Sequence, residues 1–202
     1  MTARVGLLLF PGFDLLDAGG PYEVLLTASR LAERDGGDPL YDMVPLSVDG
    51  QDVAAFGGLT VTGLTPVEEA RDLHLVIVPG LIDVDAARAD AALIAAVKAL
   101  GAEADVVASV CTGAFLLADA GLLGGLPATT HWEDLHALAA TASVGEAVPG
   151  VRWVDAGTVV TGGAIASGLH TALHLVAREH GVDHARRTAR QIDLDWEPEP
   201  SR

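Results

Sequence analysis

The sequence predicts an α/β fold in which a mainly parallel sheet lies between two layers of helices. Short apolar runs, many of them rich in valine, alternate with segments of about 10 to 15 residues that favour helix. Several of these runs are apolar throughout, which is typical of parallel strands covered on both faces. In such a fold the functional groups gather at the carboxyl ends of the strands.

The first half of the chain contains four apolar runs bounded by glycine, proline or polar residues, as expected of strands. They lie at residues 4–10, 41–48, 59–62 and 74–78. Pro21 suits the first position of a helix, so a helix is expected over residues 22–34. An alanine-rich helix is expected over residues 86–100, with Gly101 as its cap.

The second half continues the alternation. Strands are expected at residues 105–110, 127–130, 151–155 and 158–161, the last two forming a hairpin. Helices are expected at residues 114–120, 133–141, 165–179 and 184–193. No linker divides the chain, so residues 1–195 are expected to form one domain, with residues 196–202 as an exposed tail.

Composition excludes several classes of function. The net charge of −16 repels polyanions, so nucleic acid is not an expected partner. No apolar run approaches the roughly 20 residues needed to cross a membrane. The single cysteine cannot form an internal disulfide, and no secretory signal pattern is found at the N-terminus, so a cytoplasmic protein is expected.

The most informative local pattern surrounds Cys111. This residue follows an apolar strand and precedes the small residues Gly113 and Ala114. The pattern is typical of a nucleophile elbow, a sharp turn between strand and helix that exposes a reactive atom and places it near a helix N-terminus. The alternative is a buried cysteine that serves only as a small apolar residue. Local sequence does not choose between the two.

Several motifs together resemble the ThiJ/PfpI superfamily over nearly the whole chain. They are residues 10–11, 17–21, 78–80, 110–114, 128–132, 161–163 and 195–200. The combination is most similar to isocyanide (isonitrile) hydratases and to the amidase-like domains of certain transcription regulators. The resemblance implies a flavodoxin-like three-layer sandwich, usually dimeric, with a nucleophilic cysteine in the elbow. It therefore implies a homodimer that acts on a small-molecule substrate.

The resemblance also implies partners for Cys111. A carboxylic acid from the first strand-helix loop, here Asp17, would share a proton with the thiol. Taken alone, Asp17 is better explained as an ordinary turn or helix-capping residue. The Thr112 hydroxyl is expected to contact the acid or orient water, or else to cap a helix. Gly80 and Leu81 occupy positions where the family commonly has two glycines, whose amides face the sulfur and stabilise negative charge. Gly163 lies in a flexible loop expected to approach the cysteine.

Other candidate residues have weaker support. His131 would complete a Cys-His pair, although a structural role is at least as well supported. Glu23 is a second carboxylate near Asp17, expected to face outward or toward a dimer partner. His170 and His174 have metal-ligand spacing but lack further ligands, so no metal is expected. His170 also departs from the family, where this position is often acidic. The glycines form no dinucleotide or phosphate-binding motif, so no cofactor is expected.

Three functions are compatible with these residues. The first is a cofactor-independent hydro-lyase that converts small isocyanides to N-formamides through a thioimidate on Cys111. The second is a glyoxalase- or deglycase-like hydration of small dicarbonyls. The third is a non-catalytic sensor in which Cys111 is oxidised or binds a ligand. The residues after about 195 are too few to encode the helix-turn-helix module of the related regulators, and no Cys-His-acid triad supports a protease.

Overall fold

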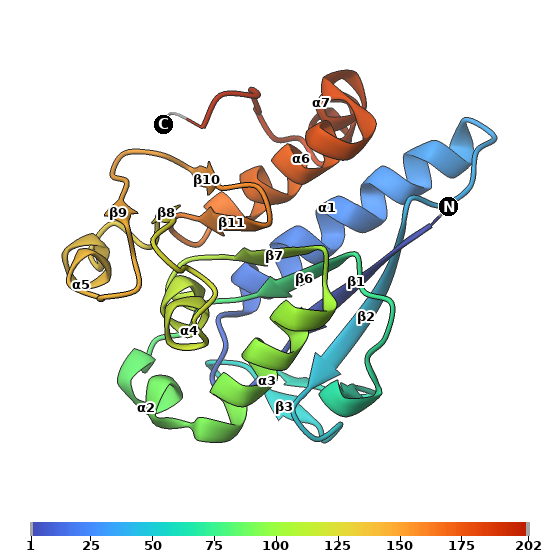
Figure 1. The fold of residues 1–202 in the computed structure, drawn as a ribbon. Coiled ribbons are helices and arrows are strands. Elements are labelled where there is room, and N and C mark those ends of the chain that lie inside the picture. Colours follow the sequence, from blue (N-terminus) through green and yellow to red (C-terminus); the bar gives the residue numbers. More distant parts are fainter. Residues whose placement is uncertain (1, 201–202) are drawn as a thin grey trace.

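The computed structural model describes residues 2–200 (Figure 1). Its centre is a seven-stranded sheet with the order β10-β11-β7-β6-β1-β2-β5. In that order the strands span Trp153–Asp155, Val159–Gly162, Val106–Ser109, Leu75–Val78, Ala3–Leu8, Tyr41–Ser47 and Thr65–Pro66. All neighbouring strands are parallel except the β10-β11 hairpin. The predicted mainly parallel sheet and the predicted hairpin are confirmed.

Helices cover both faces of this sheet, as Figure 1 shows. On one face α1 (Leu15–Arg34), α6 (Ser167–His180) and α7 (Val182–Gln191) pack against one another. On the other face lie α2 (Val84–Ala89), α3 (Ala91–Glu103) and α4 (Gly113–Asp119). The central strands β6, β7 and β11 are buried along their whole length. This burial explains why their sequences are mainly apolar.

The remaining elements are short. The pairs β3 (Val53–Ala54) with β4 (Thr60–Val61), and β8 (Pro127–Ala128) with β9 (Glu146–Ala147), form two small sheets. A 3₁₀ turn (Val67–Glu69) follows β5, and α5 (Leu135–Ala139) precedes β9. Within residues 2–200, no helix combines the length and the apolar character that crossing a membrane requires.

The first helix begins earlier than expected. Its N-cap is Asp14, whose carboxylate accepts a hydrogen bond from the Leu16 N–H at 3.3 Å, and Pro21 lies inside the helix rather than at its start. A Cβ atom on Gly20 would lie 3.3 Å from the Leu169 side chain in α6. The Gly-Pro segment therefore permits close packing of α1 on α6 instead of ending the helix.

Another helix expectation is also wrong, and one residue of the expected tail is not exposed. The helix expected over residues 86–100 is two helices, α2 and α3, because the Asp90 carboxylate accepts hydrogen bonds from the Ala92 and Leu93 N–H groups and caps a new helix there. The expected exposed tail begins with Trp196, which is buried and donates its indole N–H to the His170 carbonyl at 3.3 Å. Residues 201 and 202 lie outside the described part of the chain.

Candidate active site

Cys111 lies in a sharp turn between β7 and α4. Its φ angle is +55°, a conformation that non-glycine residues rarely adopt. The turn is fixed by long-range hydrogen bonds: the Cys111 N–H donates to the Gly163 carbonyl at 2.8 Å, and the Thr130 hydroxyl donates to the Cys111 carbonyl at 2.8 Å. The backbone has the strained geometry of a nucleophile elbow, maintained by residues distant in sequence.

Asp17 is fully buried in the first turn of α1, in contact with the loop that follows β6. Its Oδ2 accepts a hydrogen bond from the Gly80 N–H at 3.0 Å, whereas its Oδ1 has no hydrogen-bond partner within the described residues. Burial, followed by the charge of Asp14, raises the pKa of Asp17 to about 8, and hydrogen bonding with Gly80 and Cys111 only partly opposes this. Asp17 is therefore largely protonated near neutral pH.

The Cys111 thiol shares this environment. Burial, followed by the charge of Asp17, raises the pKa of the thiol to about 12, while a hydrogen bond from the Thr112 backbone N–H acts in the opposite direction. Since each group disfavours the charged form of the other, the two titrate as a pair. At neutral pH the pair retains both protons, so the site combines a thiol with a carboxylic acid able to donate.

The loop of Gly80 and Leu81 has a different role from the one expected. The Gly80 N–H is already bonded to Asp17, and the Leu81 N–H donates to Thr112 Oγ1 at 2.8 Å. The Thr112 hydroxyl in turn donates to the Leu81 carbonyl at 2.7 Å. These two amides therefore position the acid and the loop rather than remaining free to stabilise negative charge. Within residues 2–200 the Thr112 side chain makes no hydrogen bond with Asp17 and none that caps α4.

Gly80 has no room for a side chain. A Cβ atom there would lie 2.5 Å from Asp17 Oδ2 and 2.8 Å from the backbone nitrogen and Oγ1 of Thr112. Gly163 approaches the cysteine as expected, through its carbonyl, while its N–H donates to the Arg152 carbonyl at 2.8 Å. The backbones of the Gly80 loop and the Gly163 loop thus both pack against the turn that contains Cys111.

The side chains of the other candidates have partners outside this pair. His131 Nδ1 accepts a 3.4 Å hydrogen bond from the Glu133 N–H and lies 3.7 Å from the carboxylates of Glu133 and Asp134. Within residues 2–200 it makes no hydrogen bond with Cys111. Glu23 is exposed and accepts a hydrogen bond from the Thr27 hydroxyl at 3.2 Å, in line with the expected outward orientation.

The two histidines with metal-ligand spacing have separate partners. His170 contacts Arg152 at 2.8 Å, and His174 contacts Asp155 at 2.7 Å. No group of three or more potential ligands gathers around them in the described part of the chain.

Sequence reasoning missed two acidic residues near the pair. The charge of Asp14 raises the pKa of both Asp17 and Cys111, and the charge of Asp134 contributes to the raised pKa of Cys111. The position of Asp14, three residues before Asp17 and directly before a helix, was a usable signal for a cap but not for an electrostatic role.

Comparison with known proteins identifies the family. Residues 3–178 match the model of the DJ-1/PfpI family. The isonitrile hydratase of Pseudomonas putida is 35% identical over 200 residues, covering 99% of this chain and 81% of that protein. The transcriptional regulator GbdR of Pseudomonas aeruginosa is 31% identical over 183 residues, covering 88% of this chain but only 47% of the regulator.

A solved structure extends the agreement to the fold. A ThiJ/PfpI family protein from Pseudomonas syringae superposes with a TM-score of 0.83 at 26% identity, covering 98% of this chain and 77% of that one. The flavodoxin-like α/β fold implied by the sequence motifs is confirmed. Relatives of this kind include both a named hydratase and DNA-binding regulators, so membership alone does not define an activity. The chain belongs to the DJ-1/PfpI family.

Proposed function

We propose that this protein is a cysteine-dependent hydratase that converts small isocyanides to N-formamides without a cofactor. The observation that carries the proposal is the pairing of the Cys111 thiol with Asp17, a fully buried acid whose pKa is raised to about 8. Similarity to the isonitrile hydratase of Pseudomonas putida supports the same chemistry. Hydration of an isocyanide requires both a nucleophile and a proton donor at one carbon atom, and this pair supplies them.

In the first step Asp17 donates its proton to the terminal carbon of the isocyanide, which becomes electrophilic, and Cys111 Sγ attacks that carbon. A C–H bond and a C–S bond form, the thiol proton passes to the Asp17 carboxylate, and the product is a thioimidate. Water then adds to the thioimidate carbon and the C–S bond breaks. The sum is one isocyanide plus one water giving one N-formamide, with both protein groups restored.

The surroundings of the Gly80 loop suit an organic substrate. A cavity of about 370 Å³ lies beside this loop, and its lining is mainly apolar. The lining includes Phe10, Phe56, Leu81, Ile82 and Leu93. Asp17, Cys111 and Thr112 do not line this cavity themselves. Leu81 relates it to the elbow, because Leu81 is hydrogen-bonded to Thr112, the residue after Cys111. The apolar part of a small isocyanide would be accommodated here, and the side chain of Leu81 would limit its size.

The decisive experiment is incubation with several alkyl and aryl isocyanides, with the N-formamide measured by chromatography. Cys111→Ala is expected to abolish turnover while the fold, followed by circular dichroism, is retained. Once the wild-type cysteine has been alkylated by iodoacetamide at alkaline pH, where more of the thiol is ionised, turnover should be abolished to the same extent, because the chain has no other thiol. Absence of formamide from every isocyanide tested, or unchanged turnover in Cys111→Ala, would contradict the proposal.

Two competing functions are tested with the same protein. Conversion of methylglyoxal to lactate would favour the dicarbonyl reaction. An oxidation sensor requires a reactive thiolate, and the raised pKa of Cys111 disfavours this form. Modest peroxide followed by intact mass should therefore leave Cys111 largely unmodified.

We also propose a cytoplasmic homodimer. In support, the large apolar side chains of Leu15, Leu16, Phe56 and Ile82 are exposed near the loops that surround the site. Phe56 and Ile82 line the same cavity, and Leu15 and Leu16 begin the helix that contains Asp17. Light scattering across a range of concentrations tests this assembly, and a purely monomeric protein would contradict it.

A further inference from the structure

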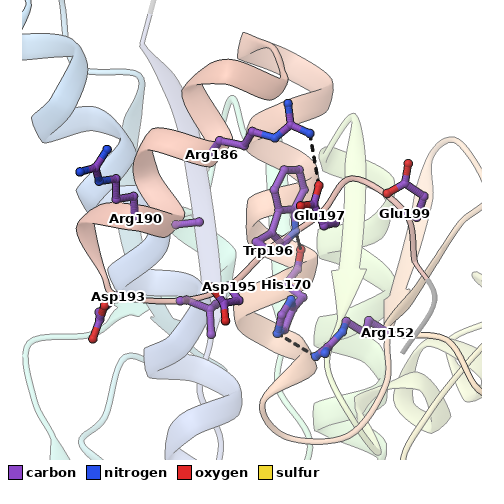
Figure 2. A pocket seen from close by; sticks show the side chains of 11 residues that line it. Arg152, His170, Arg186, Arg190, Asp193, Asp195, Trp196, Glu197 and Glu199 are labelled. Atoms are coloured by element: carbon purple, nitrogen blue, oxygen red, sulfur yellow. Dashed lines mark hydrogen bonds and ion pairs between the residues drawn. The ribbon is translucent and has the colours of Figure 1, made fainter.

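A second cavity lies on the side of the molecule formed by the C-terminal elements. Its volume is about 520 Å³, within the range of small-molecule sites. Figure 2 shows its walls, which come from the residue before β10, from α6 and α7, and from the segment that follows α7. None of Asp17, Gly80, Leu81, Cys111 and Thr112 lines it, so this cavity includes no residue of the proposed active site or of the loop beside it.

The most informative side chain in this cavity is Arg152. Its Nη1 donates to His170 Nε2 at 2.8 Å, and because a guanidinium in a protein does not lose its proton, Nε2 must be the acceptor. His170 is buried, and burial followed by the charge of Arg152 lowers its pKa to about 4. The histidine is therefore neutral near neutral pH. Among residues 2–200, no carboxylate forms an ion pair with Arg152.

The backbone of Arg152 fixes its position. Its N–H donates to the Pro200 carbonyl at 2.6 Å, and its carbonyl accepts from the Gly163 N–H at 2.8 Å. The backbone hydrogen bonds and the neutral histidine thus hold the guanidinium at the cavity. Within residues 2–200, its hydrogen bond to His170 uses only one of its N–H donors. A partly buried arginine in this state is stabilised by a carboxylate that approaches its planar group.

The remaining charges in the cavity argue against a simple anion. Arg186 is paired with Glu197 at 3.2 Å, whereas Asp195 and Glu199 line the cavity without an ion pair within the described residues. Arg190 and Asp193 lie at the end of the cavity away from Arg152 (Figure 2). In that view the Arg152 guanidinium and the Asp195 carboxylate flank His170. A ligand with one negative and one positive group would satisfy both.

We propose that this cavity binds a small zwitterion of the amino-acid class, with its carboxylate on the Arg152 guanidinium and its ammonium facing Asp195. Trp196, whose indole N–H is already bonded to the His170 carbonyl, forms part of the apolar wall. The site does not depend on the proposed hydratase activity, since the two cavities share no lining residue.

Binding is tested by calorimetry and NMR titration of the full chain with L-alanine, L-leucine and L-glutamine. Propionate and ethylamine, each lacking one charged group of L-alanine, are the matched probes. We expect at least one amino acid to bind, and each single-charge probe to bind at least about tenfold more weakly than L-alanine. No binding by any of the three amino acids, or equal binding of propionate and L-alanine, would overturn the proposal.

Variants locate the site. Arg152→Gln should weaken binding at least about tenfold, and Asp195→Asn should weaken amino-acid binding while leaving the weak binding of propionate unchanged or improved. His170→Glu places an internal carboxylate beside Arg152, so it should abolish amino-acid binding while preserving the fold, even if Arg152→Gln does not fold. Arg187→Gln, in the same helix but outside the lining of the cavity and paired with Asp35, is the control and should bind normally. Undiminished binding in His170→Glu would contradict the assignment.

Discussion

The active-site pair and the C-terminal cavity treat buried charge in opposite ways. Asp17 and Cys111 are both acids, and burial raises the pKa of each, so the pair is neutral because it keeps its protons. Arg152 and His170 are both bases, and there burial lowers the pKa of the histidine, which loses its proton while the arginine stays charged. The first pair is complete without a counterion. The second has an unbalanced positive charge.

This difference follows from the chemistry of the side chains. A carboxylic acid or a histidine becomes neutral by gaining or losing a proton, at a cost of about 1.4 kcal/mol for each unit of pKa shift. Arginine has no accessible neutral form, so only another charge balances it. A neutral pair that keeps its protons is suited to acid-base catalysis, whereas a guanidinium without a counterion is suited to binding an anionic group.

The two regions meet at one residue. Gly163 donates its N–H to the Arg152 carbonyl and accepts the Cys111 N–H at its own carbonyl, both at 2.8 Å. The same loop therefore supports the backbone of both sites, although their side chains face different cavities.

The strongest test of the comparison is Asp17→Asn. The amide is nearly the same size and its oxygen still accepts from the Gly80 N–H, but it cannot donate a carboxylic proton. We expect kcat/KM for isocyanide hydration to fall by about 10²- to 10⁴-fold. Because the charge of Asp17 raises the pKa of Cys111, the same variant should alkylate faster with iodoacetamide at a given pH.

Asp14→Asn is the matched control for Asp17→Asn. Asparagine is an equally good N-cap, so the start of α1 should be preserved. Removing this charge should lower the pKa of Asp17, which Asp14 now raises, while leaving a functional acid in place. Loss of activity in Asp14→Asn equal to that in Asp17→Asn would show that overall charge, and not the proton of Asp17, supports the reaction.

A smaller effect is expected from Gly80→Ala. The added Cβ would come within 2.5 Å of Asp17 Oδ2, so the acid or the loop must move. We expect unfolding stability to fall by about 1–3 kcal/mol, together with a loss of turnover. Gly19→Ala, in the same helix as Asp17 but with no atom within 4 Å of the new Cβ, should leave stability unchanged or slightly raised. Denaturant titration compares the two, and equal effects would show that the loop is not tightly packed on the acid.

The sequence predicted the framework of the first region better than its contacts. The apolar strand before Cys111 and the small residues after it are local signals, and they predicted the elbow. The bond between Thr112 and Leu81 joins residues 31 positions apart, and no local pattern reports such a pair. This bond occupies the Leu81 amide, and the Gly80 amide is occupied by Asp17, 63 positions away, although both amides were expected to face the sulfur.

The second region was missed for the same physical reason. Arg152 and His170 are 18 residues apart and lie on different elements, so their contact depends on how the hairpin packs on α6. Trp196 was assigned to an exposed tail because prolines and charges surround it, yet it is buried against His170. Composition describes the average environment of a segment and does not identify the one side chain that packs.

The comparison also predicts opposite responses of stability to pH. Asp17 has a raised pKa, so from about pH 4 to pH 8 the folded chain binds more protons than the unfolded chain at this residue, and stability falls as pH rises. His170 has a lowered pKa, so the unfolded chain binds more protons between about pH 4 and pH 6.5, and stability falls as pH falls. Relative to wild type, Asp17→Asn should gain stability from about pH 5 to pH 8. His170→Gln should gain about 2 kcal/mol toward pH 5 and nothing above about pH 7.

Thermal melts of the three proteins across this range measure both slopes. Other titrating groups are common to all three proteins, so their contributions cancel in the differences. His74 is an example: burial lowers its pKa, but hydrogen bonds to Asp105 and Glu179 outweigh burial and raise it. If both variants shift in the same direction with pH, one of the two protonation states is wrong. If the stability of His170→Gln relative to wild type does not change with pH, then His170 gains its proton as readily in the folded chain as in the unfolded chain. A charged His170 beside Arg152 would require an anionic neighbour. That neighbour would compete with the carboxylate of a zwitterion, and the binding experiments would detect the competition as weak affinity.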